Sequence, residues 1–379
     1  MKIFVEKSAL LKALSHGQSI VEKKTTVPIL SHVLLKAEGD TLHLTTTDLD
    51  MSLQEAIPAK VDLPGEICIS AHVIFDIVRK LSDRSLVELE ANPENNQVVI
   101  KSGRSRFELS YLLSEDFPQL AQTDLTHTFK FSSSKLKKMI EQTEASMSTD
   151  EARYNVCGVF LHSVMKDGVS MLRAVSTDYH RMALVEFPAP EGATSIPEVI
   201  VGRKAILDIK KLLDVAEENV MLGLSENRIE LVIEKDGYKG VFSSRLIEGT
   251  FPDYQSALEA EHDKYLLVPR EDFVRAVDRV GTVVSQNVRA IKIMLKNNQA
   301  QLSVVSPELG SALEEMDVDF PYDDMVELCV NVKYLLDVAQ TITEDEVEFF
   351  IINADSPVIV KGVNNTQSTF VLMPLGVDQ

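Results

Sequence analysis

An internal repeat constrains the fold of this chain more than any other feature of its sequence. An amphipathic segment with apolar residues at helical spacing occurs three times, at residues 8–14, 134–140 and 271–277, each time after a strand-like lead. Such self-similarity is typical of chains that use one structural unit again and again. Because 379 residues also exceed what one hydrophobic core usually supports, we predict three related domains.

A second helical segment follows in each third of the chain, again led by a short strand. The remaining segments alternate apolar and polar residues between Asn-Asn, Asp-Gly and Ser-Gly pairs, a pattern typical of antiparallel strands joined by tight turns. We therefore predict an α+β fold in which each domain holds two units of one strand, one helix and three strands. Two Phe-Pro phrases end the first and second copies, which predicts domains at residues 1–125, 126–258 and 259–379.

The charge of the chain is segregated between helices and strands. The six predicted helical segments carry 16 Lys and Arg and 12 Asp and Glu residues, a balance of +4, whereas the whole chain has a formal charge of −20. If the sheets place all helices on one side, a basic helical face lies opposite an acidic sheet face. Helix propensity alone offers another explanation, because Lys and Arg are good helix formers.

Several classes of protein are disfavoured by missing signals. The sequence contains no long apolar run and no signal-peptide core, so a cytoplasmic location is expected. The three cysteines stand far apart, and the eight histidines form no His-x-x-x-His pair, so neither disulfides nor a metal site are expected. Phosphate-loop and dinucleotide motifs are also missing, and no cofactor is predicted.

Two other functions are compatible with parts of the sequence. Asp178, His180 and Arg181 form the most catalytic-looking cluster, because a carboxylate can orient a histidine as a general base, yet no nucleophile motif accompanies them. An ordered histidine in a loop between strands explains them better, and no enzymatic activity is expected. The other alternative is an acidic repeat scaffold that binds only proteins.

The order of motifs along the whole chain resembles that of the bacterial β sliding clamps, the β subunit of DNA polymerase III. The motifs that carry the resemblance are Thr26-Val-Pro-Ile-Leu, Lys101-Ser-Gly-Arg-Ser-Arg-Phe, Ser176-Thr-Asp-Tyr-His-Arg-Met-Ala, Gly249-Thr-Phe-Pro-Asp-Tyr, Val330-Asn-Val-Lys-Tyr-Leu-Leu-Asp and Val371-Leu-Met-Pro-Leu. The resemblance implies three tandem DNA-clamp domains, a head-to-tail homodimeric ring with helices lining the hole and antiparallel sheets outside, and a role as a processivity factor in DNA replication.

The resemblance also implies DNA contacts that do not depend on base sequence. A ring that surrounds duplex DNA can slide along it, because phosphate contacts carry no sequence information. The positions that match the DNA contacts of the family are Lys24, His72, Arg79, Tyr154 and Asn155. His72 and Asn155 stand where a basic and an aromatic residue are expected.

A second implied surface is a hydrophobic pocket for short linear peptides of the replicative polymerase, the clamp loader and repair polymerases. Such peptides bind through a few apolar anchors in a preformed groove. The matching positions are Val156, Thr177, Tyr179, His180, Arg181, Met182, Pro252, Ser256, Ala257, Val371, Leu372, Met373, Pro374 and Leu375. Among these, Tyr179 stands where glycine is common, and Ser256 and Ala257 replace a larger basic and apolar pair.

The homodimer contact is the third implied surface. Phe107 and Leu109 in the first domain and Val283 and Val284 in the third match the apolar interface positions of the family. Pairing between strand edges would add backbone hydrogen bonds across the same joint. Ordinary core packing is an equally good explanation for each of these residues taken singly.

Overall fold

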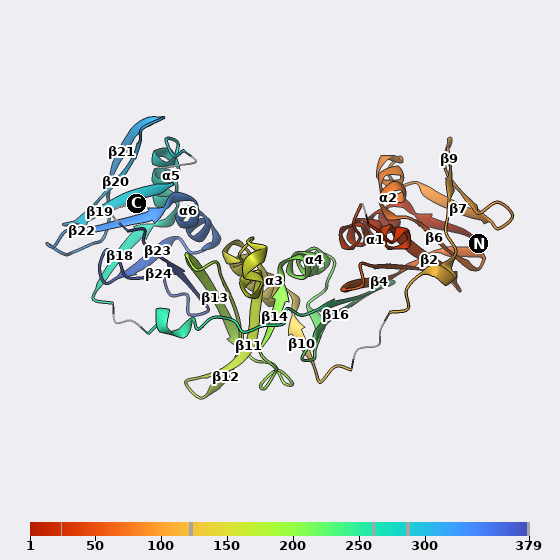
Figure 1. The fold of residues 1–379 in the computed structure, drawn as a ribbon, viewed down its shortest axis with the longest axis horizontal. Coiled ribbons are helices and arrows are strands. Elements are labelled where there is room, and N and C mark those ends of the chain that lie inside the picture. The colour runs from red at the N-terminus through yellow and green to blue at the C-terminus, as the bar shows by residue number, and fades with distance from the viewer. Residues whose placement is uncertain (24, 121–123, 260–261, 286–288, 377–379) are drawn as a thin grey trace. The chain divides into compact units, whose positions relative to one another are not determined.

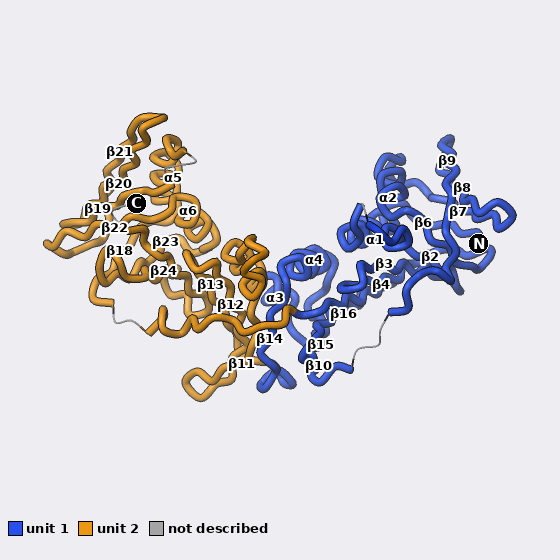
Figure 2. The backbone as a smooth tube through the Cα atoms, viewed as in Figure 1, with its two compact units in different colours: residues 1–137, 190–246 blue, residues 138–189, 247–379 orange. Residues whose placement is uncertain are grey.

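A computed structural model describes residues 1–23, 25–120, 124–259, 262–285 and 289–376. Helices alternate with runs of antiparallel strands along the described chain (Figure 1). The chain divides into two compact units, residues 1–137 with 190–246 and residues 138–189 with 247–379 (Figure 2). Both units include parts of the predicted middle domain, and the predicted borders near residues 125 and 258 stay a prediction.

The first two elements illustrate how the sequence pattern produces the structure. Strand β1 (Lys2–Glu6) alternates, with Ile3 and Val5 fully buried between residues that keep contact with solvent. Helix α1 (Lys7–Ile20) buries Leu10 and Leu14 at a spacing of one helical turn. The same two periodicities recur through the chain.

Unit 1 contains the elements that precede residue 133 and those of the segment from residue 190 to residue 246. Besides β1 and α1, these are η1 (Pro28–Ser31), β2 (His32–Glu38), β3 (Thr41–Thr47), β4 (Met51–Pro58), β5 (Lys60–Leu63), β6 (Gly65–Ser70), α2 (Ala71–Lys80), β7 (Leu86–Asn92), β8 (Gln97–Ser102), β9 (Ser105–Ser110), η2 (Ser114–Asp116), β10 (His127–Ser132), β14 (Val199–Gly202), α4 (Arg203–Leu213), β15 (Asn219–Leu224), β16 (Arg228–Lys235) and β17 (Tyr238–Arg245). Helix α3 (Ser133–Thr143) begins in this unit.

Two antiparallel sheets organise unit 1. One has the order β5-β1-β7-β8-β9, and the other has the order β10-β15-β16-β17-β4-β3-β2-β6. One apolar core joins α1 and α2 to both sheets and includes Leu10, Ile74, Leu35 and Leu89. The two helices therefore bury their apolar faces against sheets, as amphipathic elements must.

Unit 2 repeats this organisation. Its elements are η3 (Glu144–Ser146), η4 (Glu151–Val156), β11 (Gly158–Lys166), β12 (Val169–Thr177), β13 (Arg181–Pro188), η5 (Gln255–Ala257), β18 (Lys264–Pro269), α5 (Arg270–Gly281), β19 (Ala290–Lys296), β20 (Gln299–Ser306), β21 (Gly310–Asp317), β22 (Val326–Asn331), α6 (Val332–Thr341), β23 (Glu346–Ile351), β24 (Val358–Gly362) and β25 (Ser368–Leu372). Its strands form the orders β11-β12-β13-β25-β24-β23-β18 and β21-β20-β19-β22. Phe273 of α5 and Leu335 of α6 belong to the core between them.

The predicted unit of strand, helix and three strands is confirmed. It occurs six times among the described residues, with β5 as an additional strand in the first third. Cys68 is fully buried as expected, but Cys157 and Cys329 are only partly buried, and all three are free thiols. No helix of the described residues is long and apolar enough to cross a membrane. The same residues contain no cluster of His, Cys, Asp and Glu that could hold a metal ion.

Each unit has one ladder that joins sequence-distant repeats into a continuous sheet. In unit 1, β4 pairs with β17, and Ser52 lies opposite Ser243. In unit 2, β13 pairs with β25, and Met182 lies opposite Val371. In both ladders, the third strand after a helix in the first half of one predicted domain meets the last strand of the next predicted domain.

A buried polar network supports the ladder of unit 1. The Glu55 carboxylate is 2% exposed, lies 2.8 Å from His16 Nδ1 and accepts a 2.7 Å hydrogen bond from the Tyr238 hydroxyl. Burial, together with the charge of Glu55, raises the pKa of Tyr238 far above its ordinary value, so the hydroxyl stays protonated and donates. Glu55 is on β4 and Tyr238 is at the start of β17, so the bond ties the two strands together.

We predict that Tyr238→Phe destabilises unit 1 by about 1–3 kcal/mol, because it leaves a buried carboxylate with one hydrogen bond fewer. The free energy of unfolding is to be measured from urea denaturation. The matched control is Tyr154→Phe, since Tyr154 is 57% exposed. Equal stability of the two variants would contradict the role given to the buried bond.

Candidate functional site

A tight turn between β12 and β13 forms the first wall of the candidate peptide site in unit 2. The Thr177 hydroxyl donates to the Arg181 carbonyl (2.7 Å), and Asp178 Oδ1 accepts hydrogen bonds from the backbone N–H groups of His180 and Arg181, both at 3.0 Å. Tyr179 lies between them in the left-handed region, with φ of 71°. The turn therefore holds two exposed rings, those of Tyr179 and His180, on a rigid base.

Arg181 connects this turn to helix α6. Its side chain, 8% exposed, donates to Asp178 Oδ2 at 3.1 Å and also donates to Asp337. Its guanidinium lies 4.2 Å from the centroid of the Tyr334 ring, and the His180 ring stacks on Tyr334 with centroids 6.3 Å apart. A cation held between two carboxylates and an aromatic face fixes the position of the turn against the helix.

The last strand of the chain forms the second wall. Leu372 lies opposite Arg181 in the ladder, and the Met373 N–H donates to the His180 carbonyl at 2.9 Å. The Leu375 N–H then donates to the Cys329 carbonyl at 2.7 Å, which carries the chain toward β22. Val371 and Leu372 are buried, whereas Met373 is 36% exposed. This wall therefore presents one flexible apolar side chain above a buried base.

The segment from Pro252 to the end of η5 carries Pro252, Ser256 and Ala257 and is anchored by the buried Tyr254. The Tyr254 hydroxyl lies 2.9 Å from His162 Nε2 and accepts a 3.1 Å hydrogen bond from Arg173. Arg173 in turn donates to Glu186 at 2.6 Å and 2.9 Å. Three neighbouring strands, β11, β12 and β13, thus hold this segment through one phenol group.

The charge of Glu186 sustains that anchor. Burial alone would raise the pKa of its carboxyl, but hydrogen bonds from Lys166 and Arg173 outweigh burial and hold the pKa below its ordinary value. Glu186 is 2% exposed and therefore stays ionised next to two cations. Because two cations neutralise its charge, the buried Glu186 carboxylate can hold the Arg173 side chain in the position that reaches Tyr254.

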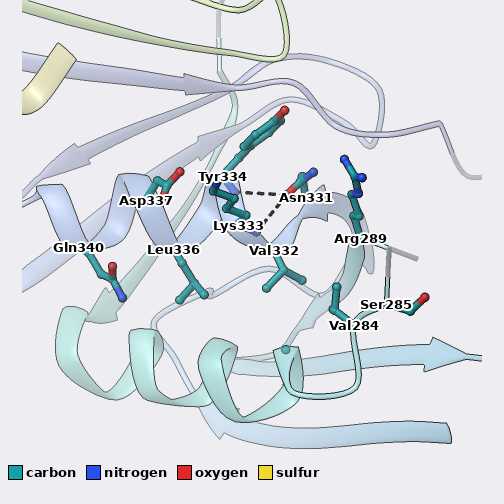
Figure 3. A pocket seen from close by; sticks show the side chains of 11 residues that line it. Val284, Ser285, Arg289, Asn331, Val332, Lys333, Tyr334, Leu336, Asp337 and Gln340 are labelled. Atoms are coloured by element: carbon teal, nitrogen blue, oxygen red, sulfur yellow. Dashed lines mark hydrogen bonds between the residues drawn. The ribbon is translucent and has the colours of Figure 1, made fainter. Parts of the chain in front are cut away.

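A cavity of about 850 Å³ lies beside this site, between the end of α5 and the start of α6 (Figure 3). Tyr334 and Asp337, the two contacts of Arg181 on α6, line it. At its edge, Asn331 Oδ1 caps the helix by accepting from the N–H groups of Lys333 (3.0 Å) and Tyr334 (3.3 Å), drawn as dashed lines in Figure 3. Tyr334 and Asp337 are not among the site residues predicted from the sequence, although the motif from Val330 to Asp337 contains both.

The predicted peptide-site residues differ in their exposure. The structure joins Thr177, Arg181, Met182, Val371, Leu372 and Met373 through the turn and the ladder described above. Val156 is fully buried and Met182 is 5% exposed, so both form the base and not the rim. Pro252, Ala257, Pro374 and Leu375 are half-buried, and Ser256 is exposed.

The predicted DNA-contact residues are distributed over both units. Lys24 lies outside the described residues. Arg79 is exposed on α2 and donates to Asp76 at 2.9 Å, whereas His72 Nδ1 lies 3.2 Å from Gln18 and its Nε2 is buried without a hydrogen-bond partner among the described residues. In unit 2, Tyr154 is 57% exposed, and Asn155 donates to the Thr250 carbonyl at 3.0 Å. Arg79 and Tyr154 therefore present their side chains to solvent, and His72 does not present Nε2.

A shallow groove of about 540 Å³ between α1 and α2 gathers further cations around Arg79. Lys12 and Arg84 line it, together with the half-buried ring of Phe75 and with Asp83, whose charge is paired with Lys7. The guanidinium of Arg79 lies 5.5 Å from the centroid of that ring. The helical face of unit 1 therefore carries a local positive patch on a chain that is acidic as a whole.

Two of the predicted dimer residues lie on an edge strand, and the other two follow helix α5. Phe107 and Leu109 are half-buried on β9, which ends the five-stranded sheet of unit 1. In unit 2, β21 ends the four-stranded sheet, and Val283 and Val284 pack partly against the core beside it. Among the described residues, neither β9 nor β21 has a second neighbouring strand.

Comparison with known proteins covers nearly the whole chain. Family profiles described as the N-terminal, central and C-terminal domains of the DNA polymerase III beta subunit match residues 1–121, 130–253 and 255–376. A protein named beta sliding clamp from Caulobacter vibrioides is 39% identical over 377 residues, which is 100% of both chains. One of the same name from Pseudomonas putida is 33% identical over 379 residues, 99% of this chain and 100% of that one.

Solved structures agree with these relatives. A crystal structure of the Caulobacter crescentus beta sliding clamp, with polyethylene glycol bound to a putative beta-motif tethering region, has a TM-score of 0.94 and 39% identity over 100% of this chain and 99% of that one. The DnaN sliding clamp of Bartonella birtlesii bound to griselimycin has a TM-score of 0.94 and 37% identity over 100% of both chains. The chain therefore belongs to the DNA polymerase III beta subunit family, the bacterial β sliding clamps.

Proposed function

We propose that this chain acts in DNA replication as a sliding clamp, a homodimeric ring that encircles duplex DNA and tethers the replicative polymerase. The observation that carries the proposal is the match of all three family domains along one chain. A topological link explains how a protein with a formal charge of −20 can stay on DNA with few direct phosphate contacts. The scaffold that binds only proteins is not favoured, because the relatives are named beta sliding clamps.

The protein is proposed to have no catalytic activity of its own. The carboxylate of Asp178 accepts hydrogen bonds from two backbone N–H groups and from the Arg181 side chain, so its oxygens stabilise the turn. The His180 ring stacks on Tyr334. This arrangement supports a binding role for the cluster over a hydrolytic one, and loading of the ring is assigned to a separate clamp loader.

Head-to-tail dimerisation is supported by the pattern of strand pairing. In each predicted domain, one strand ends the first half (β4, β13 and β21) and one strand ends the second half (β9, β17 and β25). Two pairs form between these strands, β4 with β17 and β13 with β25. The two strands left over are β21 and β9, and each lies at the edge of its sheet. Pairing of β21 with β9 of a second copy would complete the set. Such a heterologous contact yields a closed ring when its rotation closes.

Charge supports the same pairing. Strand β9 carries Arg106, which forms an ion pair with Glu108, and follows Arg104, whereas β21 carries the acidic residues Glu314, Glu315 and Asp317. The acidic edge of β21 disfavours pairing with its own copy, and Arg104 and Arg106 offer it charges of the opposite sign. We propose Phe107, Leu109, Val283 and Val284 as the apolar part of this interface.

We predict that Leu109→Glu converts the dimer to a monomer, because it adds a buried charge of the same sign as Glu314 at the interface. Sedimentation velocity at micromolar concentration measures the change. Leu63→Glu is the matched control, since Leu63 is 56% exposed on β5 at the opposite edge of the same sheet. A dimeric Leu109→Glu variant would contradict the proposed interface.

The site between the 177–181 turn, the end of β25 and the segment from Pro252 to Ala257 is proposed to bind the clamp-binding peptides of the polymerase, the clamp loader and repair polymerases. Its fixed backbone and exposed Met373 suit a short peptide with apolar anchors. The interactions that hold Arg181 and Tyr254 keep the groove preformed, which lowers the cost of ordering on binding.

We predict that Met373→Glu weakens binding of a clamp-binding peptide by at least about tenfold, because a charge replaces an apolar contact of the groove. The readout is fluorescence polarisation with a labelled peptide from the cognate polymerase. Met325→Glu serves as the control, since Met325 is 63% exposed elsewhere in unit 2. If both variants bind the peptide like the unmodified chain, the site is misplaced.

The clamp function itself is tested by topology. After loading by a cognate clamp loader, we expect the protein to remain on nicked circular plasmid and to be lost from the same plasmid after linearisation. The comparison is made at a salt concentration that removes simple electrostatic binding. Equal loss from both plasmids would exclude a closed sliding ring and leave the scaffold as the better explanation.

A further inference from the structure

The turn that builds the peptide site of unit 2 has a structural copy in unit 1. In the turn from Thr47 to Met51, the threonine hydroxyl again donates to the carbonyl of the last residue at 2.7 Å. The aspartate, Asp48, again accepts backbone hydrogen bonds from the two last residues, at 3.1 Å and 2.7 Å. Leu49 takes the place of Tyr179 with φ of 82°. Both turns lead directly into the strand that pairs with the last strand of another repeat.

A groove of about 700 Å³ lies next to this ladder on the sheet of unit 1. Its walls are strands β2, β3, β4, β16 and β17 and the segment from Ser114 to Leu120. That segment contains Phe117-Pro118, the counterpart of Phe251-Pro252 at the peptide site of unit 2. The groove therefore occupies the position in unit 1 that corresponds to the peptide site in unit 2.

The chemistry of the groove differs from that of its counterpart. Where Met182 faces Val371 in the ladder of unit 2, Ser52 faces Ser243 in the ladder of unit 1. Thr45 and Gln54 add further polar groups to the lining. Within the described part of the chain, the side chains of Thr45, Ser52 and Gln54 form no hydrogen bonds, so their polar groups are available to a ligand.

Two carboxylates, those of Glu230 and Asp124, line the groove, and Glu230 lies on its floor of strands. Its side chain on β16 is half-buried, and burial raises the pKa of its carboxyl above the ordinary value. No described residue forms an ion pair or a hydrogen bond with this carboxylate. Desolvating a carboxylate without a partner is unfavourable, and a ligand cation would remove that cost.

We infer that this groove is a second binding site, which takes an extended peptide segment of a partner protein and pairs a lysine or arginine of that segment with Glu230. The hydroxyl and amide groups of Thr45, Ser52 and Gln54 would bond the peptide backbone, and Phe117 and Leu34 would contact its aliphatic stem. The volume lies within the range of about 300–1,000 Å³ of ordinary ligand sites. This inference goes beyond the proposed function, since it concerns a different groove and a cationic ligand.

The test uses the full chain and a fluorescein-labelled ten-residue peptide of alternating lysine and valine. Fluorescence polarisation measures its affinity for the unmodified chain, for Glu230→Gln and for Glu38→Gln. Glu38 is an exposed carboxylate on β2 that pairs with Lys36, so its substitution removes the same charge elsewhere in unit 1. We expect Glu230→Gln to weaken binding by about tenfold, because it removes the charge-assisted hydrogen bond to the lysine of the peptide. Glu38→Gln is expected to leave the affinity within about twofold, because Glu38 lies outside the groove.

Hydrogen exchange locates the peptide and separates the two grooves. The lysine-valine peptide is expected to slow amide exchange in residues 45–54 and 241–243, and Met373→Glu is expected to bind it like the unmodified chain. Equal weakening by Glu230→Gln and Glu38→Gln would show general attraction to an acidic protein and overturn the proposal. Protection confined to residues 371–375 would overturn it as well, because the peptide would then occupy the first groove.

Discussion

The structure depends on backbone pairing between strands that are far apart in the sequence. The ladders of β4 with β17 and of β13 with β25 convert separate repeats into continuous sheets. Backbone N–H and C=O groups at a sheet edge must find partners, and an edge of another repeat provides them without any special side chain. The turns and segments that build both grooves lie at these two ladders. Position in the ladder, more than local sequence, therefore decides where a binding site can form.

The two grooves show how one backbone arrangement supports different chemistry. At the first, Arg181 is enclosed by Asp178, Asp337 and the Tyr334 ring, and the base is apolar. At the second, hydroxyl groups replace the apolar pair and a carboxylate lacks a protein partner within the described residues. The same turn therefore occurs twice with different side chains around it. A peptide that fits one groove is therefore a poor ligand for the other.

Much of this architecture could be predicted from the sequence, because periodicity and repeats are local signals. The six helices and the order of strands along the chain follow from spacing alone. The family resemblance predicts that Met182 and Val371 belong to one pocket, and the two residues lie opposite each other in the ladder. Contacts between distant segments could not be read in this way. The link from Arg181 to Asp337 spans 156 residues, and that from Arg173 to Tyr254 spans 81. His72 shows the same limit, because only the folded structure places its Nδ1 3.2 Å from Gln18 and buries its Nε2.

The unmatched edges of β9 and β21 have a consequence for the newly made chain. An open strand edge is a template for any other extended chain, and aggregation begins at such templates. In the proposed dimer each edge covers the other, so assembly would also protect the protein from aggregation. Before assembly, an incorrect partner meets the charged side chains of Arg106 and Glu108 on β9 and of Glu315 on β21. Dilute or newly synthesised chains would then rely on these charges until a second copy arrives.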